Sequence, residues 1–210
     1  CELLMSRAKQ ERSRKTEVRI VNATEQLLKR RLFDEITVAD IVAEANATVG
    51  SFYNLFDDKN SLLPYLYQNH CNKLIEECDS LDDQFQGTSG KLDALVERLV
   101  QAILELNKKQ RGLLRALVLR AHNQPSGPTD RKAPMENVLK RIAELVAQNR
   151  DEINHPRPTL AARVGLLAVL ATIREVCLYP ATSADSLPVN ERDLERELTR
   201  MWLSYLKTNY

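Results

Sequence analysis

Two short amphipathic segments, separated only by a tight turn, constrain the fold of this chain most. Both carry apolar residues at the spacing of one helix face: Val38, Ile41, Val42 and Ala45 in the first, and Val49, Phe52 and Phe56 in the second. Thr37 and Thr48 precede them as N-cap candidates, and Asp40 stands where a capping box has its acid. Helices this short are unstable alone in water, so a third helix must hold them at a fixed angle.

Helical periodicity continues over nearly all of the remaining sequence, and no stretch alternates apolar and polar residues as a strand does. A first helix is expected over residues 15–30, with Ile20 and Leu27 on its buried face. A longer helix is expected from Asp58 toward Cys78. We therefore predict an all-α fold of about nine helices, with a three-helix N-terminal domain followed by a larger helical bundle.

The segment 159–178 differs from the others because it is apolar on almost every side. A helix of this kind must be covered all round. In a chain of 210 residues, part of that cover is expected to come from a second copy. The final segment carries one apolar face, with Leu198 and Trp202 near its middle. We predict a homodimer formed through the last two helices.

Charge is unevenly distributed although the net charge is only +1. Nine cations precede Leu32, against few acids: Arg7, Lys9, Arg12, Arg14, Lys15, Arg19, Lys29, Arg30 and Arg31. A solvated helix face would explain such a run. A surface that meets a polyanion such as nucleic acid would explain it equally well.

Cysteine and histidine spacing gives no metal motif, and no cofactor or metal is expected. His70, Cys71 and Cys78 on one helix could form a metal or redox site, but free cysteines more often pack as small apolar groups. The sequence contains no apolar run long enough for a membrane span and no signal peptide. The reducing cytoplasm is the simplest compartment, with no membrane partner. The residues before Met5 could be native or added.

Two short helices across a tight turn, braced by a third, form a helix-turn-helix. In that motif the second helix enters the major groove of double-stranded DNA. With Val49, Phe52 and Phe56 packed inward, the second helix is expected to present four residues to DNA, namely Gly50, Ser51, Tyr53 and Asn54.

At these residues the chain resembles the tetracycline-repressor (TetR) family of transcriptional regulators. The resemblance runs from Ala23 to Leu63, and its most specific part is Phe52-Tyr53, Phe56, Lys59 and Leu62. It implies that Thr37 and Thr48 cap their helices and contact phosphates, and that Tyr53 and Lys59 also bind phosphates. It further implies close backbone approach at Gly50. Val49, Ser51 and Asn54 are implied as neighbours of bases or sugars.

The resemblance also implies the domain organisation and the activity. Residues 1–14 would be a basic flexible arm, 15–57 the helix-turn-helix domain, and 58–210 the ligand-binding and dimerisation domain. The protein would be a repressor that binds a palindromic operator as a dimer. A small apolar or amphipathic effector would release it from DNA.

The sequence says less about the effector site. Apolar residues of the large domain, together with one arginine, are candidates for its lining: Leu99, Ile103, Leu117, Leu139, Ile142, Leu170, Ile173 and Arg174. At helical spacing the apolar ones fit an ordinary core equally well. Arg174 could receive an anionic effector or pair across the dimer interface.

Several residues depart from the family pattern. Leu32 and Asn46 stand where glycine is usual, and Val49 stands where a cation is frequent. Asp57 and Asp58 add negative charge near the DNA-facing corner. The basic stretch before Arg19 is therefore expected to supply attraction that the recognition helix lacks.

Two other classes of function stay open at this point. A small helical enzyme is one, but the sequence has no HExxH, no phosphate-binding glycine loop and no nucleophile motif, so no catalytic residue is assigned. A helical interaction module whose basic arm binds a membrane or acidic partners is the other. A regulator would show both a steep salt dependence and a preference for one DNA sequence, whereas an interaction module would show no such preference. The operator, the effector, the regulated genes and the choice between repression and activation are not encoded in these patterns.

Overall fold

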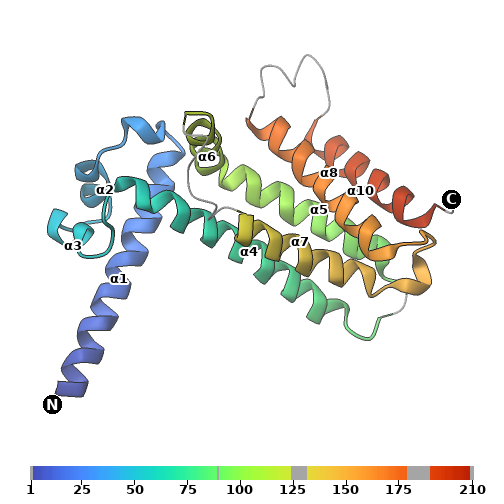
Figure 1. Cartoon of the computed structure of the whole chain (residues 1–210), viewed down its shortest axis with the longest axis horizontal. Coiled ribbons are helices and arrows are strands. Elements are labelled where there is room, and N and C mark those ends of the chain that lie inside the picture. The colour runs from blue at the N-terminus through green and yellow to red at the C-terminus, as the bar shows by residue number, and fades with distance from the viewer. Residues whose placement is uncertain (1, 89, 124–131, 179–189, 209–210) are drawn as a thin grey trace. The chain divides into compact units, whose positions relative to one another are not determined.

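A computed structural model describes residues 2–88, 90–123, 132–178 and 190–208 of the chain. Nine α-helices form in this part, which contains no strand (Figure 1): α1 (Glu2–Leu28), α2 (Val38–Glu44), α3 (Val49–Tyr53), α4 (Leu62–Phe85), α5 (Leu92–Lys109), α6 (Arg111–Asn123), α7 (Lys132–Ala147), α8 (Pro158–Leu178) and α10 (Glu191–Lys207). Three short 3-10 helices accompany them: η1 (Phe33–Glu35), η2 (Lys59–Ser61) and η4 (Arg150–Glu152). The predicted all-α fold is confirmed.

The described residues fall into two compact units. The N-terminal unit contains residues 2–67 and 110–123, and so includes the first turns of α4 and all of α6. The C-terminal unit contains the rest of α4 together with α5, α7, α8 and α10. The boundary that the sequence suggests, between residues 57 and 58, stays a prediction. The contacts divide the chain differently, because they group the first turns of α4 and all of α6 with the N-terminal helices.

The core of the N-terminal unit forms where α2, α3 and α6 pack against α1. Its fully buried side chains include Ile20, Ile36, Ile41, Phe52, Leu62 and Leu66. Helix α6 approaches α1 so closely that a Cβ atom on Gly112 would lie 2.0 Å from the carbonyl oxygen of Leu28. Beside this contact, Gln110 Nε2 donates a hydrogen bond of 3.0 Å to Glu25 Oε1. Glycine is therefore required where these two helices meet.

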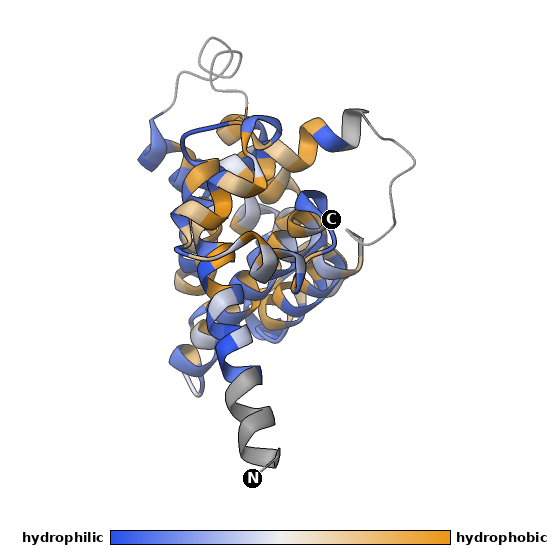
Figure 2. Ribbon diagram, turned by 90° about the vertical axis from the view of Figure 1, so that its left-hand side faces the viewer, coloured by the Kyte–Doolittle hydropathy of each residue, from blue (hydrophilic) through white to orange (hydrophobic). Residues whose placement is uncertain are grey.

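Helix α1 begins earlier than predicted. The sequence indicated a flexible arm over residues 1–14, but the helix is continuous from Glu2 to Leu28. The reason is local: the segment holds mostly good helix formers and no glycine or proline. An ion pair of 2.8 Å between Lys15 and Glu11, one turn apart, supports this part of the helix. The turns between residue 10 and Arg19 are hydrophilic, blue in Figure 2.

The core of the C-terminal unit forms where α8 packs against α7, α5 and α10. Its fully buried residues include Val96, Ile103, Val146, Leu166, Ile173 and Trp202. The indole of Trp202 lies directly over Gly165, where a Cβ atom would come within 2.0 Å of the ring. The carboxylate of Glu152 accepts hydrogen bonds from the backbone N–H groups of Lys91 and Leu92 and so caps the start of α5. Buried apolar side chains and this helix cap together hold the bundle in place.

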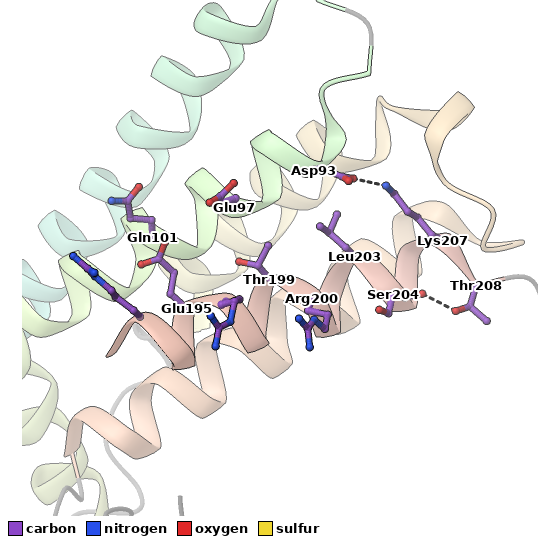
Figure 3. A pocket seen from close by; sticks show the side chains of 12 residues that line it. Asp93, Glu97, Gln101, Glu195, Thr199, Arg200, Leu203, Ser204, Lys207 and Thr208 are labelled. Atoms are coloured by element: carbon purple, nitrogen blue, oxygen red, sulfur yellow. Dashed lines mark hydrogen bonds and ion pairs between the residues drawn. The ribbon is translucent and has the colours of Figure 1, made fainter. Parts of the chain in front are cut away.

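A shallow polar groove of about 980 Å³ lies between α5 and α10 on the C-terminal unit (Figure 3). Its α5 side is acidic, with Asp93 and Glu97, and its α10 side carries Arg192, Arg196 and Arg200. Lys207 pairs with Asp93 across the groove. The charges of the groove thus largely compensate one another.

Candidate nucleic-acid interface

Helix α2 starts with a complete capping box. The Asp40 N–H donates to Thr37 Oγ1 at 3.1 Å, and the Thr37 N–H donates back to Asp40 Oδ2 at 2.8 Å. The Thr37 hydroxyl donates to the same carboxylate at 2.7 Å. These bonds from Thr37, followed by the nearby Arg31 guanidinium, lower the pKa of Asp40. The predicted cap is present, and it fixes where α2 begins.

The turn between α2 and α3 has the Schellman form. Asn46 adopts φ = +48°, and the Ala47 N–H donates to the Val42 carbonyl at 2.8 Å. Asparagine tolerates this left-handed conformation better than most residues, so it can stand where the family usually has glycine. Leu32 is the other residue that stands where the family usually has glycine. Its φ of −71° is a backbone conformation that any residue adopts, so glycine is not needed there. Neither departure disturbs the local fold.

Arg19 of α1 braces this turn from outside. Its Nη1 donates to the Asn46 carbonyl oxygen at 2.9 Å, and its Nη2 donates to Thr16 Oγ1 at 3.2 Å. Sequence reasoning treated Arg19 only as the end of a basic stretch. No pattern in the sequence pairs residues 27 positions apart, so this role appears only in the structure.

Helix α3 presents one side to solvent. The Ser51 N–H donates to Thr48 Oγ1 at 3.1 Å, which confirms the predicted cap, while Phe52 is fully buried. Val49 is 48% exposed and Tyr53 55% exposed, and the other members of the predicted DNA-facing set, Gly50, Ser51 and Asn54, are exposed or half-buried. Val49 was also predicted to pack inward. That was wrong: it lies at the first position of α3, on the exposed side.

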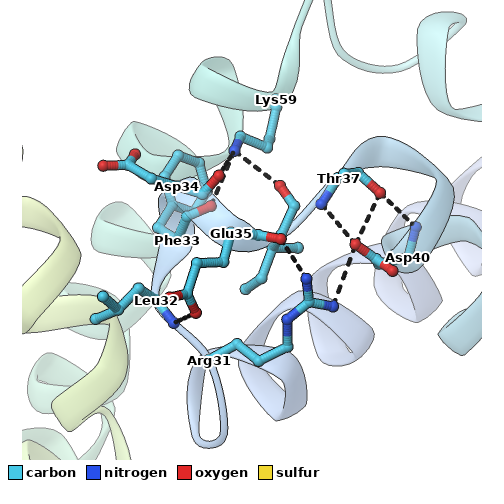
Figure 4. A network of polar contacts seen from close by, with 9 residues as sticks. Arg31, Leu32, Phe33, Asp34, Glu35, Thr37, Asp40 and Lys59 are labelled. Carbon is cyan, nitrogen blue, oxygen red and sulfur yellow. Dashed lines mark hydrogen bonds and ion pairs between the residues drawn. The ribbon is translucent and has the colours of Figure 1, made fainter.

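Lys59 does not point outward from the start of α4, as a phosphate contact requires. Its ammonium donates to the carbonyl oxygens of Phe33 at 2.9 Å and Ile36 at 2.8 Å, with Asp34 at 3.5 Å (Figure 4). It also lies 4.6 Å from the centroid of the Phe33 ring. An ammonium group has three donors. The geometry therefore gives Lys59 a different role, that of joining η2 to the segment that leads into α2.

We expect Lys59→Met to lower the free energy of unfolding of the N-terminal unit by about 1–3 kcal/mol, because charge-assisted bonds to the two part-buried carbonyls are lost. Methionine keeps most of the side-chain volume. Lys29→Met is the matched control, since Lys29 is exposed and bonds only a neighbouring side chain, Gln26. Thermal unfolding of both variants measures the difference. Equal unfolding temperatures would show that the Lys59 contacts contribute nothing.

The candidate effector residues do not gather around a described groove. Five are buried in the packed helices, namely Leu99, Ile103, Leu117, Ile142 and Ile173, and two, Leu139 and Leu170, are half-buried. None of them lines the groove between α5 and α10. Leu117 belongs to α6 and hence to the N-terminal unit. Arg174 is exposed on α8, which favours the alternative that it pairs with a partner over the alternative that it lines an enclosed site.

The cysteines of α4 are buried. Cys71 and Cys78 are fully buried, and burial raises the pKa of the Cys78 thiol to about 11. A thiol of this kind stays protonated at neutral pH and is a poor metal ligand or nucleophile. Within the described ranges, no group of three or more His, Cys, Asp or Glu side chains is placed to hold a metal ion. In the same part of the chain, no helix has the length and apolarity of a membrane span.

Two family models match the sequence. The model of bacterial regulatory proteins of the tetR family matches residues 20–66, the segment that contains α2 and α3. The model of the tetracyclin repressor-like C-terminal domain matches residues 91–206, more than half of the chain. The chain belongs to the TetR family. Its expected family membership is thus confirmed, and TetR-family proteins are ligand-responsive, DNA-binding regulators of transcription.

Solved structures of TetR-family proteins share this fold. A TetR-family regulator from Mesorhizobium loti has a TM-score of 0.72 at 20% identity, covering 93% of this chain and 96% of its own. LfrR from Mycobacterium smegmatis, solved in complex with proflavine, has a TM-score of 0.58 at 20% identity, covering 93% and 98%. FadR from Bacillus halodurans, a fatty acid degradation regulator, has 0.65 at 14%, covering 88% and 93%. No curated protein matches the chain.

Proposed function

We propose that the protein is a repressor that binds a palindromic operator as a homodimer and is released by a small apolar or amphipathic effector. The observation that carries this proposal is the exposed side of α3, from Val49 to Tyr53. Caps and a Schellman turn fix it on a buried core. The match to a tetracyclin repressor-like C-terminal domain supports repression rather than activation. Such a protein would act in the cytoplasm, where bacterial DNA lies.

Contacts to DNA are proposed for the exposed residues of the two short helices. The hydroxyl groups of Thr48 and Tyr53 suit phosphates, which accept hydrogen bonds from uncharged side chains as well as from cations. The Thr37 hydroxyl would do the same once it turns from the Asp40 carboxylate, to which it donates in the free protein. Ser51 and Asn54 suit base edges, and Val49 suits an apolar contact such as a thymine methyl group. Sequence preference would then come from Val49 and Ser51 of α3 and from Asn54, the C-cap of that helix.

Dimerisation is proposed through α8 and α10. Along α8, Leu160, Val164 and Leu167 are 39–57% exposed at the i, i+4 and i+7 positions of one face, and Met201 of α10 is 42% exposed. This is the helix that the sequence required to be covered all round, yet one chain leaves this side open. An isologous pair would bury both copies of the face. Two α3 helices related by a two-fold axis call for a palindromic operator.

The effector site is proposed within the helices of the C-terminal unit. Leu99 and Ile103 of α5, Ile142 of α7 and Ile173 of α8 would supply apolar walls, in keeping with an apolar or amphipathic effector. LfrR was solved in complex with proflavine, and FadR is a fatty acid degradation regulator, which supports an effector of this chemistry. To act, the effector must bind the DNA-free arrangement more tightly than the DNA-bound one.

The direct test is selection of bound sequences from a random DNA library, followed by titration at several salt concentrations. We expect an inverted repeat whose half-sites lie about 34–36 Å apart, or a multiple of that distance. Affinity for it should exceed affinity for random DNA by about 10³ or more. Enrichment of no sequence would refute operator binding and favour an interaction module.

The Gly50→Ala variant tests whether glycine at this position is required by the fold of the free protein or by the approach of DNA. A Cβ atom here would meet nothing closer than Thr48 Oγ1 at 4.0 Å, so the free protein has room for it. We expect alanine to stabilise the protein by about 0.4–1 kcal/mol, because it restricts the unfolded chain. Operator affinity should nevertheless fall about tenfold or more, because the methyl group would press against the DNA backbone. Unchanged affinity would remove Gly50 from the interface.

A further inference from the structure

The proposed DNA-facing surface is short of positive charge. Residues 37–58, which include α2, the turn and α3, contain no lysine or arginine. They contain four acids: Asp40, Glu44, Asp57 and Asp58. Affinity for duplex DNA depends chiefly on cations that neutralise phosphates and release their counterions. A regulator with this recognition surface must therefore place its cations elsewhere.

The cations closest to these helices along the chain are already engaged. The Lys59 ammonium is bonded to backbone carbonyls. Arg30 forms an ion pair of 2.9 Å with Glu44, and Arg31 forms one of 3.2 Å with Asp40. These pairs offset the acids of α2 and leave no surplus charge for phosphates.

Helix α1 carries further exposed cations, and among Arg12, Arg14, Lys15 and Arg19 the side chain of Arg19 is the one bonded to a backbone carbonyl. Arg12, Arg14, Lys15 and Arg19 line a shallow depression on α1 together with Val18, which is 51% exposed. We call these four residues the α1 cation row. The i, i+3 and i+7 spacing of Arg12, Lys15 and Arg19 keeps them on one stripe of the helix. Only Lys15 is offset by a carboxylate, that of Glu11, in an exposed pair that contributes little.

The α1 cation row leads directly to the recognition helix. Arg19, at its end, donates to the Asn46 carbonyl, and Asn46 lies two residues before the N-cap of α3. Because both belong to the N-terminal unit, the row and the exposed side of α3 are fixed by the same contacts. From Arg12 to Arg19 the row extends about 10 Å along the helix axis, at 1.5 Å per residue. Successive phosphates of one strand advance by about 3.4 Å along duplex DNA, so the row spans about three of them.

We propose that the α1 cation row is a second DNA-contacting surface, which binds about three phosphates next to the bases faced by α3 and reads no sequence. This inference rests on the proposed operator binding and assigns most of its electrostatic affinity to α1. In this arrangement α3 supplies specificity with uncharged residues. Arg19 has two roles, since it braces the turn and closes the row.

The test is a triple variant, Arg12→Ala, Arg14→Ala and Lys15→Ala, titrated with the selected operator and with random DNA at several salt concentrations. Alanine is the best helix former, so α1 should persist, and Arg19 is kept because it bonds the turn. We expect the slope of log K against log salt to become shallower by about 2–3 on both DNAs. The ratio of operator to random affinity should stay within about threefold, because phosphate contacts carry no sequence information.

The matched control is Arg98→Ala, Lys109→Ala and Lys140→Ala, which removes the same charge from exposed positions of the C-terminal unit. Its slope should stay that of the wild type. An unchanged slope in the α1 variant, or equal changes in both variants, would overturn the proposal, because net charge alone would then explain the effect. If the wild type prefers no sequence, operator binding is refuted instead. The slopes on random DNA then decide separately whether the row binds phosphates.

Discussion

Leu167→Glu is expected to convert the protein from a dimer to a monomer and to lower operator affinity by about 100-fold or more. Leu167 is 57% exposed, the most exposed of the large apolar residues on α8, and belongs to the face proposed for dimerisation. A carboxylate buried in the interface by each copy, without a partner, carries a large free-energy cost. The loss of affinity follows because the second half-site would no longer be held at high effective concentration.

Analytical ultracentrifugation and operator titration of the same samples measure both effects. Leu119→Glu is the matched control, because Leu119 is 43% exposed but lies on α6 in the N-terminal unit. It should remain dimeric. A Leu167→Glu protein that stays dimeric at micromolar concentration would place the interface elsewhere, and α8 would then need another cover.

Gly112→Ala is expected to destabilise the N-terminal unit by about 3 kcal/mol, a large fraction of the stability of a small unit. The added Cβ would lie 2.0 Å from the Leu28 carbonyl oxygen and 2.6 Å from its carbon. Both obstacles are backbone atoms, so no side chain can turn aside, and α6 must move away from α1. Operator binding should fall with the folded fraction as the temperature rises.

Gly50→Ala provides the comparison for this variant, since the same methyl group enters open space there. Thermal unfolding should rank Gly50→Ala at or above the wild type and Gly112→Ala well below it. At low temperature, where both variants are folded, the order of operator affinity should be reversed. Gly112→Ala should bind the operator as the wild type does, because Gly112 is not proposed to touch DNA, whereas Gly50→Ala should bind it more weakly. Equal unfolding temperatures for Gly112→Ala and the wild type would contradict the close packing of α6 on α1.

Local features of this fold could be predicted from the sequence. The caps at Thr37 and Thr48 depend on residues three positions away, and the left-handed turn at Asn46 depends on its own side chain. Most core positions of α1 to α3 follow from apolar spacing, but Val38 and Val49, each the first residue of its helix, are half-buried and exposed respectively. Rules that act over a single turn are sufficient for all of these.

The contacts of Lys59 and Arg19 could not be predicted in the same way. Each joins segments more than 20 residues apart, and the direction of a long flexible side chain is set by the carbonyl groups that the folded backbone happens to present. The effector site has a different difficulty. Residues such as Ile103 and Ile142 have the same spacing whether they line a cavity or fill a core, so periodicity alone does not separate the two.

The N-terminal unit is discontinuous in the chain, and this matters for anyone who builds hybrid regulators. If residues 1–67 alone were moved into another regulator, α1 would pack against that regulator's own helix. Leu28 and Glu25 would then lose Gly112 and Gln110, the residues that they contact here. A working hybrid needs two splice regions, so that 110–123 travels with 1–67. New operator specificity would then be transferred together with the helix on which its supporting surface depends.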